Sequence, residues 1–555
     1  MGDLKKLKIW FMNVVKEYCL RFDEDHPLIV FKRHWRYLIV SMSLFSLLVI
    51  SLILVTLIHF PLLIVLILIC ALSCSAITTL VISFIPYLKL RSHFEELEKE
   101  ALWLATLVRF HSITGQPILK IFDTLAEVPF KAIQREAKAF LRLSITQGRL
   151  TTLVKELVRV PRGAWYQFLR YVESVAIHGQ NSETASEAMY RSIEVRYRAY
   201  LERKVAGMNT LAIGVTSLFA LLPLTMLTIA SIIASKASAP IAISTTVINV
   251  LLAVVVIATS LKTFSEEPLL HKQYLKCIPL IPAPVVSYVL ASQLLNRAFY
   301  SALAPLSLIT VTIISLALAD KLISSQLKIT NEIFEHTPIF LGDCLVHMSQ
   351  GKDLVTAAMD VLDKTSYSED FDEFMKMMTT SAMVSGFEEA LRQFKKAIQR
   401  SIFIILYLAL KASWFGNLAA LSAVIEALRD YKDIVLTLKR KLSIIRIVFL
   451  MAVLISLGMT VYMLKCVVPM LANLSLSMTS ISMKAIVVMP MEFITPDQIP
   501  QLKELICLSL FINSTVGALT IGAISSLRLA GGIRFALITS LLVGTGLFLF
   551  LLGVI

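Results

Sequence analysis

The chain has 555 residues, of which 57% are hydrophobic and only 17% are charged, against about 25% charged in an ordinary soluble domain. Its apolar residues fall into long uncharged blocks, which excludes a soluble globular protein and indicates a multi-pass membrane protein. A formal net charge of +14 would suggest nucleic acid in a soluble protein. In a membrane protein basic residues orient the helices, so no nucleic-acid partner is expected.

Residues 1–36 form a basic segment that is expected to be cytoplasmic. It is amphipathic, and its lysines and aromatic residues are Lys5, Lys6, Lys8, Lys16, Trp10 and Phe11. Such a segment is expected to lie on the inner membrane surface. The first uncharged block begins near Tyr37 and is too long for the apolar region of a cleavable signal peptide.

Nine stretches, uncharged except for Lys465 in the seventh, approach or exceed the roughly 20 residues that a helix needs to cross a bilayer. They are 37–58, 62–85, 209–234, 241–261, 278–296, 299–319, 447–471, 506–527 and 535–554. The fifth contains Pro279, Pro282 and Pro284. It is therefore predicted either to span the membrane with a kink or to be re-entrant.

The distribution of basic residues predicts the topology. With the N-terminus inside, 48 of the 53 Lys and Arg residues lie on the cytoplasmic side and four lie outside, as the positive-inside rule requires. The C-terminus is then external. The predicted domains are the N-terminal segment 1–36, a transmembrane hairpin 37–85, a helical bundle 86–207, transmembrane helices 208–319, a second bundle 320–446, and transmembrane helices 447–555 with an external loop 472–505.

The two large polar segments are predicted to be all-α. Their apolar residues recur at helical spacing, as in Ile118, Ile121, Phe122 and Leu125. Breaks between helices are expected at glycines and prolines, among them Pro338. The apolar block 402–410 is too short to span a membrane and is predicted to be a core helix of the second bundle.

Helix-breaking glycines occur in the same order in both polar segments. The pairs are Gly115 and Gly351, Gly148 and Gly386, and Gly179 and Gly416, separated by 236, 238 and 237 residues. Each glycine is predicted to end a helix in a left-handed conformation. The near-constant offset predicts two copies of one unit on the same side of the membrane, a parallel repeat rather than the inverted repeat of many transporters.

The order of Gly115, Gly148, Glu173 and Gly179 before a long amphipathic helix and a membrane span resembles the type II secretion F-domain family. The glycines recur in the second copy, which departs from the pattern in having Lys411 about where the first has Glu173. These are the inner-membrane platform proteins of type IV pili, type II secretion systems and archaella. The duplicated bundle and the nine spans are more similar to the archaeal branch, the archaellum or archaeal type IV pilus assembly platform, than to the three-span bacterial branch.

The resemblance implies a non-enzymatic role in protein secretion and filament assembly at the cell membrane, without a cofactor. Its implied partners are a hexameric secretion ATPase on the cytoplasmic side, pilin-like or archaellin subunits, membrane lipids and a second copy in a homodimer. An archaellum, an adhesive pilus and a DNA-uptake pilus all remain open as the filament.

The sequence contains no nucleotide-binding P-loop, no zinc-protease motif and no nucleophile elbow. No catalytic residue and no metal site are therefore expected. Asn249 is predicted to make a helix–helix hydrogen bond. Lys465 lies within a predicted span, where two roles are open: contact with a neighbouring helix or a pilin-like subunit, or extension toward the outer interface.

The first bundle has a net charge of +6 and the second has a net charge of zero. The first is thus the better candidate for docking an acidic partner or anionic lipid. The candidate partner-binding residues there are Lys131, Arg135, Lys138 and Arg142, together with Glu173. The alternative function is a transporter or channel subunit. It is less favoured because few ionisable residues lie inside the predicted spans.

Overall fold

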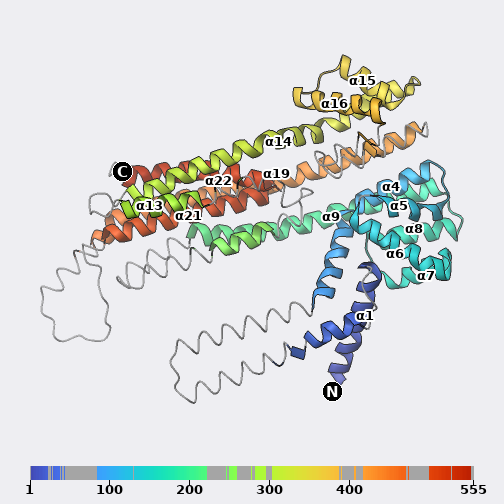
Figure 1. Cartoon of the computed structure of the whole chain (residues 1–555), viewed down its shortest axis with the longest axis horizontal. Coiled ribbons are helices and arrows are strands. Elements are labelled where there is room, and N and C mark those ends of the chain that lie inside the picture. The colour runs from blue at the N-terminus through green and yellow to red at the C-terminus, as the bar shows by residue number, and fades with distance from the viewer. Residues whose placement is uncertain are drawn as a thin grey trace. The chain divides into compact units, whose positions relative to one another are not determined.

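The computed structural model consists of helices throughout the residues that it describes (Figure 1). These are 2–22, 29–37, 84–128, 130–221, 249–258, 283–294, 303–386, 417–470, 499–526 and 528–551, with a few isolated positions between them. The prediction of an all-α chain is confirmed for this part. The chain divides into two compact units, Met1–Tyr197 with Lys411–Ala427, and Arg198–Leu410 with Leu428–Ile555.

The first unit is a bundle of short helices. Its elements are α1 (Gly2–Phe22), a helix over 84–99, α4 (Ala101–Ile113), the 3-10 helix η1 (Ile118–Lys120), α5 (Ile121–Glu127), α6 (Lys131–Gln147), α7 (Arg149–Arg159), α8 (Ala164–Ala176) and the beginnings of α9 (Ser182–Thr216) and α19 (Leu418–Tyr462). We call α4 to α8 with the start of α9 the first bundle.

The helices of the first bundle are held in place by caps from other elements. The carboxylate of Glu100 accepts hydrogen bonds of 3.0 Å from the backbone N–H groups of Ala132 and Ile133 at the start of α6. Glu98 does the same for Ala164 at the start of α8, at 3.1 Å. These carboxylates satisfy donors that have no partner within their own helix and complement the positive end of the helix dipole.

An aromatic cluster forms the centre of the first bundle. The rings of Phe122 and Phe140 are stacked, Phe168 lies edge-on to Phe122, and Trp165 lies 4.8 Å from Phe168. All four side chains are buried. The apolar spacing that predicted amphipathic helices here is therefore confirmed, because Ile121, Phe122 and Leu125 face this core.

Helix α1 buries part of its apolar face within the N-terminal segment. Phe11, Val15 and Tyr18 are buried in a cluster with Val30 and Phe31. Ile9 and Trp10 of the same helix remain exposed, and the location of this segment on the membrane surface stays a prediction.

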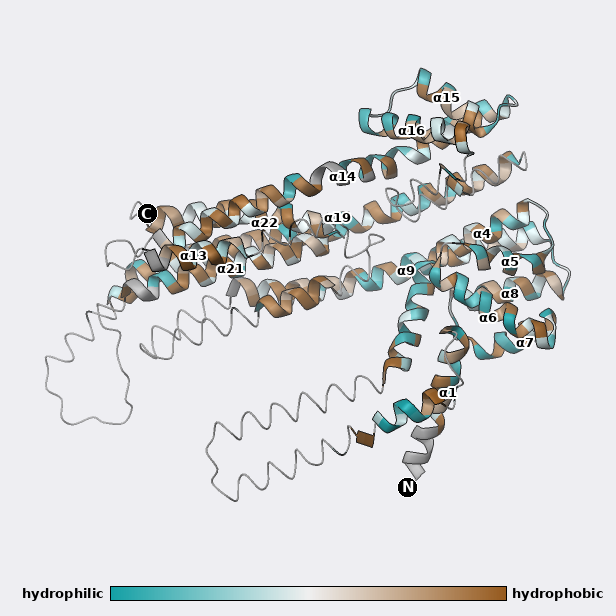
Figure 2. Cartoon of the chain, in the orientation of Figure 1, coloured by the Kyte–Doolittle hydropathy of each residue, from teal (hydrophilic) through white to brown (hydrophobic). Residues whose placement is uncertain are grey.

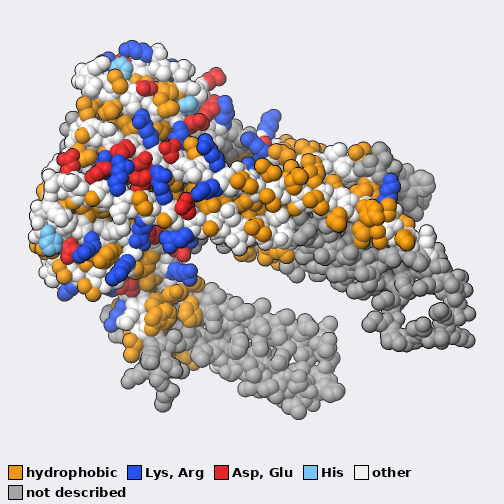
Figure 3. Space-filling view, turned by 180° about the vertical axis from the view of Figure 1, so that it is seen from behind, with side chains coloured by type: hydrophobic (Ala, Val, Ile, Leu, Met, Phe, Trp, Pro, Cys, Tyr) orange, Lys and Arg blue, Asp and Glu red, His pale blue; other side chains and the backbone are white. Residues whose placement is uncertain are grey.

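Among the described residues, four helices are long and apolar enough to cross a membrane: Ala304–Ile323 in α14 (Leu303–Ser349), Leu418–Met470 containing α19, Lys503–Ser526 in α21 (Ile499–Ser526), and α22 (Leu529–Leu551). They match the predicted spans 299–319, 447–471, 506–527 and 535–554. Figure 2 shows brown, hydrophobic residues along these helices, and Figure 3 shows orange side chains on the face of the second unit that it displays.

The other five predicted spans lie wholly or partly outside the described residues. Those at 37–58 and 62–85 are almost entirely outside. Of 209–234 the structure describes the end of α9 and the π-helix η2 (Ser217–Leu221). Of 241–261 it describes mainly an apolar helix over Asn249–Ala258, and of 278–296 mainly α13 (Ala283–Leu294). The external loop 472–505 and the core helix 402–410 are likewise mostly outside.

Small residues allow α21 and α22 to pack closely. A Cβ added at Gly532 would lie 2.5 Å from the backbone oxygen of Leu519, and one added at Gly522 would lie 2.8 Å from the Cα of Gly532. Another at Gly544 would meet Ile309 of α14 at 2.9 Å. Close backbone approach through glycine is typical of helix association in membranes, where lipid gives no hydrophobic driving force.

The second bundle consists of α15 (Leu354–Lys364) and α16 (Glu369–Ser385) packed on the C-terminal half of α14. Asp353 and Ser368 cap the starts of α15 and α16. The hydroxyl of Tyr367 donates to Asp343 at 2.5 Å. Burial, together with this carboxylate, raises the pKa of Tyr367, so the phenol stays protonated and serves as a structural donor.

The predicted break at Pro338 was wrong, because α14 runs unbroken from Leu303 to Ser349 with Pro338 inside it. A proline removes one backbone hydrogen bond and crowds the preceding turn. Buried neighbours such as Phe340 and Leu341 pack against the second bundle. This packing offsets the local cost and keeps the helix continuous.

Five of the six repeat glycines have positive φ, namely Gly115, Gly148, Gly179, Gly351 and Gly386; Gly416 lies outside the described residues. The prediction of positive φ is confirmed for these five. Gly148 and Gly386 have φ/ψ of 81°/150° and 84°/150°, so their ψ is extended and not that of the left-handed helix. This region is open essentially to glycine alone.

Candidate interaction sites of the helical bundles

The N-terminal helix α1 is joined to the first bundle by a buried group of charges, which we call the Arg21 cluster. It consists of Glu17, Arg21, His93, Glu136, Glu156 and Arg159. Arg21 Nε lies 2.6 Å and His93 Nε2 lies 2.7 Å from the same Glu136 oxygen, and none of these three side chains is more than 1% exposed. The cluster links α1, the helix over 84–99, α6 and α7.

Opposing effects set the ionisation of the two buried carboxyl groups. Burial works to raise the pKa of Glu136, but Arg21 and His93 outweigh it and the pKa is lowered. Burial wins at Glu156, where the pKa is raised although Arg21 and Arg159 act against it. Glu136 therefore serves as the anionic centre, because a buried charge is stable only when paired and hydrogen-bonded.

The structure separates the four basic residues proposed for partner binding into two pairs. Lys131 and Lys138 are exposed on α6. Arg142 donates to the backbone oxygen of Leu20 at 3.1 Å, and Arg135 lies over the Phe22 ring at 4.9 Å. The two arginines thus contact α1, which sequence reasoning did not anticipate, and the lysines remain accessible to a partner.

The other two proposed partner-binding residues are on other helices. Glu173 is half-buried on α8 and pairs with Arg170 at 3.0 Å. Lys465 is exposed in the π-helix η4 (Met463–Val467) of the second unit, near the end of the candidate span at Met470.

A closed ring of four charged side chains fastens the start of α19 to the first bundle. Arg109 lies 2.6 Å from Glu187 and 2.7 Å from Glu426, while Arg191 lies 3.1 Å and 2.8 Å from the same two carboxylates. Both guanidinium groups lie over the ring of Tyr190. The ring ties α4, α9 and α19 together, and no sequence pattern indicated it.

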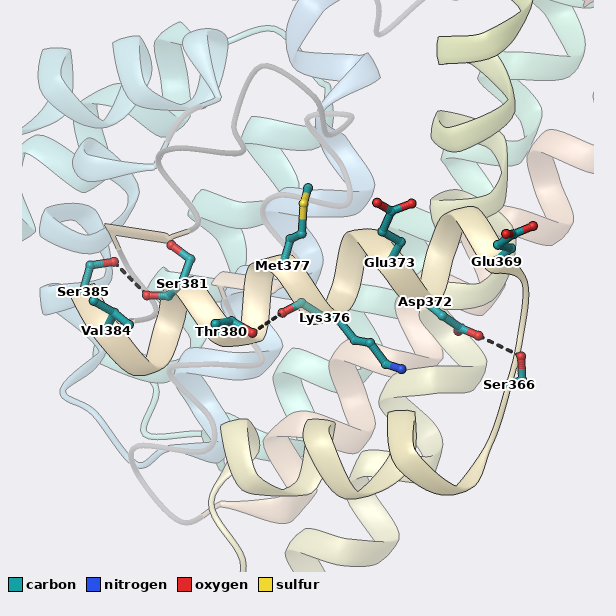
Figure 4. A pocket seen from close by; sticks show the side chains of 10 residues that line it. All are labelled: Ser366, Glu369, Asp372, Glu373, Lys376, Met377, Thr380, Ser381, Val384 and Ser385. Carbon is teal, nitrogen blue, oxygen red and sulfur yellow. Dashed lines mark hydrogen bonds between the residues drawn. The ribbon is translucent and has the colours of Figure 1, made fainter.

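The second bundle carries a shallow groove of about 910 Å³ along α16. Figure 4 shows its side chains arrayed along that helix, with Ser366 at one end. Asp372 accepts hydrogen bonds from the Ser366 hydroxyl and from the Tyr367 backbone. This carboxylate stabilises the turn before α16, so the groove offers an acidic, partly apolar surface without a catalytic arrangement.

Polar side chains within the apolar helices of the second unit bind one another. Asn249 donates to the side-chain oxygen of Asn513 at 3.1 Å, and Asn513 donates to Ser509 at 3.2 Å. Both asparagines are buried. The predicted helix–helix hydrogen bond of Asn249 is confirmed, and the network joins two apolar helices.

Within the described residues no three His, Cys, Asp or Glu side chains are placed to hold a metal ion. No family model matches the chain, and no curated protein or solved structure matches it significantly. The sites above therefore rest on geometry alone, and they are surfaces and joints between helices.

Proposed function

We propose that this chain is a non-enzymatic membrane platform for the assembly of a type IV pilus-like filament, an archaellum or an archaeal pilus. It would couple a cytoplasmic secretion ATPase to the extraction of pilin-like subunits from the cell membrane and their insertion into the filament. The N-terminus and both bundles would face the cytoplasm, and the C-terminus would be external.

Matching helix geometry in the two bundles is the observation that carries this proposal. Helices α6 and α16 each have 17 residues, and both their starts and their ends are 238 residues apart. Each ends at a glycine of nearly identical backbone conformation, Gly148 and Gly386. A repeated unit is the simplest origin of such agreement.

Two further features support the repeat at an offset of 236. Helix η1 begins at Ile118 and α15 at Leu354. The side chains of Asn181 and Asn417 cap the starts of α9 and α19 by accepting backbone hydrogen bonds. The agreement extends from the middle of each bundle to the long helix that leaves it.

The long helix α19 provides a means of transmitting motion. Helix α19 has 45 residues, which corresponds to a length of roughly 68 Å at 1.5 Å per residue. It begins at the charged ring of the first bundle and continues as a candidate membrane span. A continuous helix resists compression, so displacement of its polar end by an ATPase would move its membrane end.

Co-expression with the secretion ATPase and a pilin-like subunit of the same cell tests the proposal. Deletion of the platform should abolish filaments while leaving ATP hydrolysis by the purified ATPase intact, and the solubilised platform should retain the ATPase on affinity resin. Reporter fusions near residues 130 and 370 should lie on the same side of the membrane. Fusions on opposite sides would refute the parallel repeat and with it the platform.

A transporter or channel subunit is the alternative function. The Asn249–Asn513 network is the observation closest to it, because polar groups inside membrane helices can mark a transport path. These asparagines are hydrogen-bonded to each other and to Ser509, an arrangement that favours helix association. Solute flux into proteoliposomes that is lost in an Asn513→Leu variant would favour the alternative.

A further inference from the structure

Helix α7 of the first bundle carries an apolar stripe on its outer face. Leu150, Val154 and Val158, spaced four residues apart, are 47%, 49% and 88% exposed. The stripe begins next to the turn at Gly148, and Ile145 in the last turn of α6 is 83% exposed. Single exposed apolar residues are ordinary, but an aligned set is typical of an interaction surface.

The fold of the first bundle does not need this stripe. The inner face of α7 is supplied by Thr152, Leu153 and Glu156, which are buried. Leucine and valine on the opposite face gain no burial there, and valine is a mediocre helix former. The stripe therefore lowers solubility without stabilising the bundle. Binding of a partner explains its presence better than a role in the fold does.

Two exposed basic residues lie on or just after the helix that carries the stripe. Lys155 is exposed on α7, and Arg162 is exposed just after it. The acidic residue of α7, Glu156, is buried in the Arg21 cluster and does not reach the outer face. A protein surface that fits here has small apolar side chains in its centre and carboxylates at its rim, as electrostatic complementarity requires.

In the sequence, the segment after Gly386 keeps apolar residues at the positions of the inner face of α7 and has charged residues at the positions of the stripe. With Gly386 aligned to Gly148, the inner positions Thr152, Leu153 and Glu156 correspond to Ala390, Leu391 and Phe394. The outer positions Leu150, Val154 and Val158 correspond to Glu388, Arg392 and Lys396. The apolar residues of the stripe are thus not repeated in the sequence of the second copy, which argues for a specific partner of α7 and against a general requirement of the fold.

We propose that the α7 stripe is the docking surface for the cytoplasmic ATPase, which would meet it with an apolar patch rimmed by Asp and Glu. This inference rests on the proposed function and on the repeat. It assigns the contact to α7 of the first bundle.

A matched pair of valine substitutions tests the assignment in the full-length protein. Val158→Glu in the stripe is compared with Val384→Glu at the end of α16, where the valine is 85% exposed. Neither change should affect folding, because both side chains point to solvent. We expect V158E, alone or with V154E, to weaken ATPase binding at least tenfold and V384E to leave it within twofold.

The binding results distinguish failure of the α7 docking assignment from failure of the proposed function. If the unmodified chain retains no ATPase, the proposed function fails. If it retains the ATPase and V154E/V158E binds equally well, or if V384E is as damaging as V158E, the α7 assignment is overturned while the function stands. Light scattering that shows V158E changing the platform's own oligomeric mass, with ATPase binding unchanged, would make the stripe an interface between copies and would also overturn it.

A rim substitution supplies an independent measurement. Lys155→Glu should weaken ATPase binding mainly through the association rate, and the difference from the unmodified chain should shrink as salt is raised. A Lys155→Glu effect that does not depend on salt would count against a carboxylate rim on the partner. A fluorophore at position 158 that shifts to the blue in anionic nanodiscs without ATPase would place the stripe on lipid, contrary to the proposal.

Discussion

Replacing Arg21 by methionine should release α1 from the first bundle. The substitution leaves Glu136 buried, with His93 as its remaining hydrogen-bonding partner in the Arg21 cluster. Removing one member of a buried ion pair costs about 3–5 kcal/mol, and because His93 remains we expect the lower end, about 3 kcal/mol. Since each 1.4 kcal/mol is tenfold in an equilibrium constant, backbone amides of α1 should exchange roughly 100-fold faster.

Hydrogen exchange followed by mass spectrometry on the full-length protein in nanodiscs measures this effect. Arg91→Met is the control, because Arg91 is 66% exposed and its pair with Glu95 at 3.6 Å lies on the surface. Such a pair contributes at most about 0.5 kcal/mol. The double variant R21M/E136Q should recover most of the protection, because a neutral glutamine does not need the lost counter-ion and can still accept from His93.

The reasoning would be refuted if exchange of α1 in Arg21→Met rose less than threefold. It would also fail if R21M/E136Q exchanged as fast as R21M, because the penalty would then not arise from an unpaired Glu136 charge. The lowered pKa of Glu136 sets the pH range. Its contribution is present above the carboxyl's ordinary pKa and is lost as pH falls through the lowered value, so Glu136 by itself should add no pH dependence to the protection of α1 between pH 5 and 8.

Three other variants test separate features. Burial lowers the pKa of His111, so its contribution to stability is present above its ordinary value of 6.5 and is lost as pH falls through the lowered pKa; His111→Gln should flatten thermal stability between about pH 6.5 and 5. Gly148→Ala should cost about 1–3 kcal/mol in a chemical denaturation of the bundle, because a side chain disfavours positive φ with extended ψ. Gly532→Ala should separate α21 from α22, since its Cβ would meet the backbone oxygen of Leu519. Gly458→Ala is the control and should leave α21 and α22 together, because its Cβ meets nothing within 4 Å. The yield of disulfide trapping between α21 and α22 measures the difference between the two variants.

The sequence alone predicted those features that depend on local pattern. A membrane span is recognisable because an uncharged block of about 20 residues has few other stable environments, and four predicted spans are matched by apolar helices. The repeat glycines were recognisable because positive φ is costly for other residues. Gly115, Gly148 and Gly386 accordingly show it.

Tertiary structure decided where the charged residues are used. Arg135 and Arg142 are basic residues of the same helix as Lys131 and Lys138, and the sequence does not distinguish the two pairs. In the structure α1 contacts the arginines and leaves the lysines exposed. No single-sequence pattern reports which surface a distant helix covers. The α7 stripe was missed for a related reason, because apolar residues at helical spacing indicate a buried face unless the opposite face is known to be the buried one.

Long-range pairing and the fate of Pro338 likewise depended on the fold. Arg109 and Glu426 are 317 residues apart and Arg21 and Glu136 are 115 apart, so no periodicity links them. At Pro338 a local rule predicted a break and the packing of α14 against α15 and α16 prevailed. The sequence thus determined which segments are helices and where most of them turn, whereas burial, which requires neighbours from elsewhere in the chain, determined which charges are paired and which surfaces remain for partners.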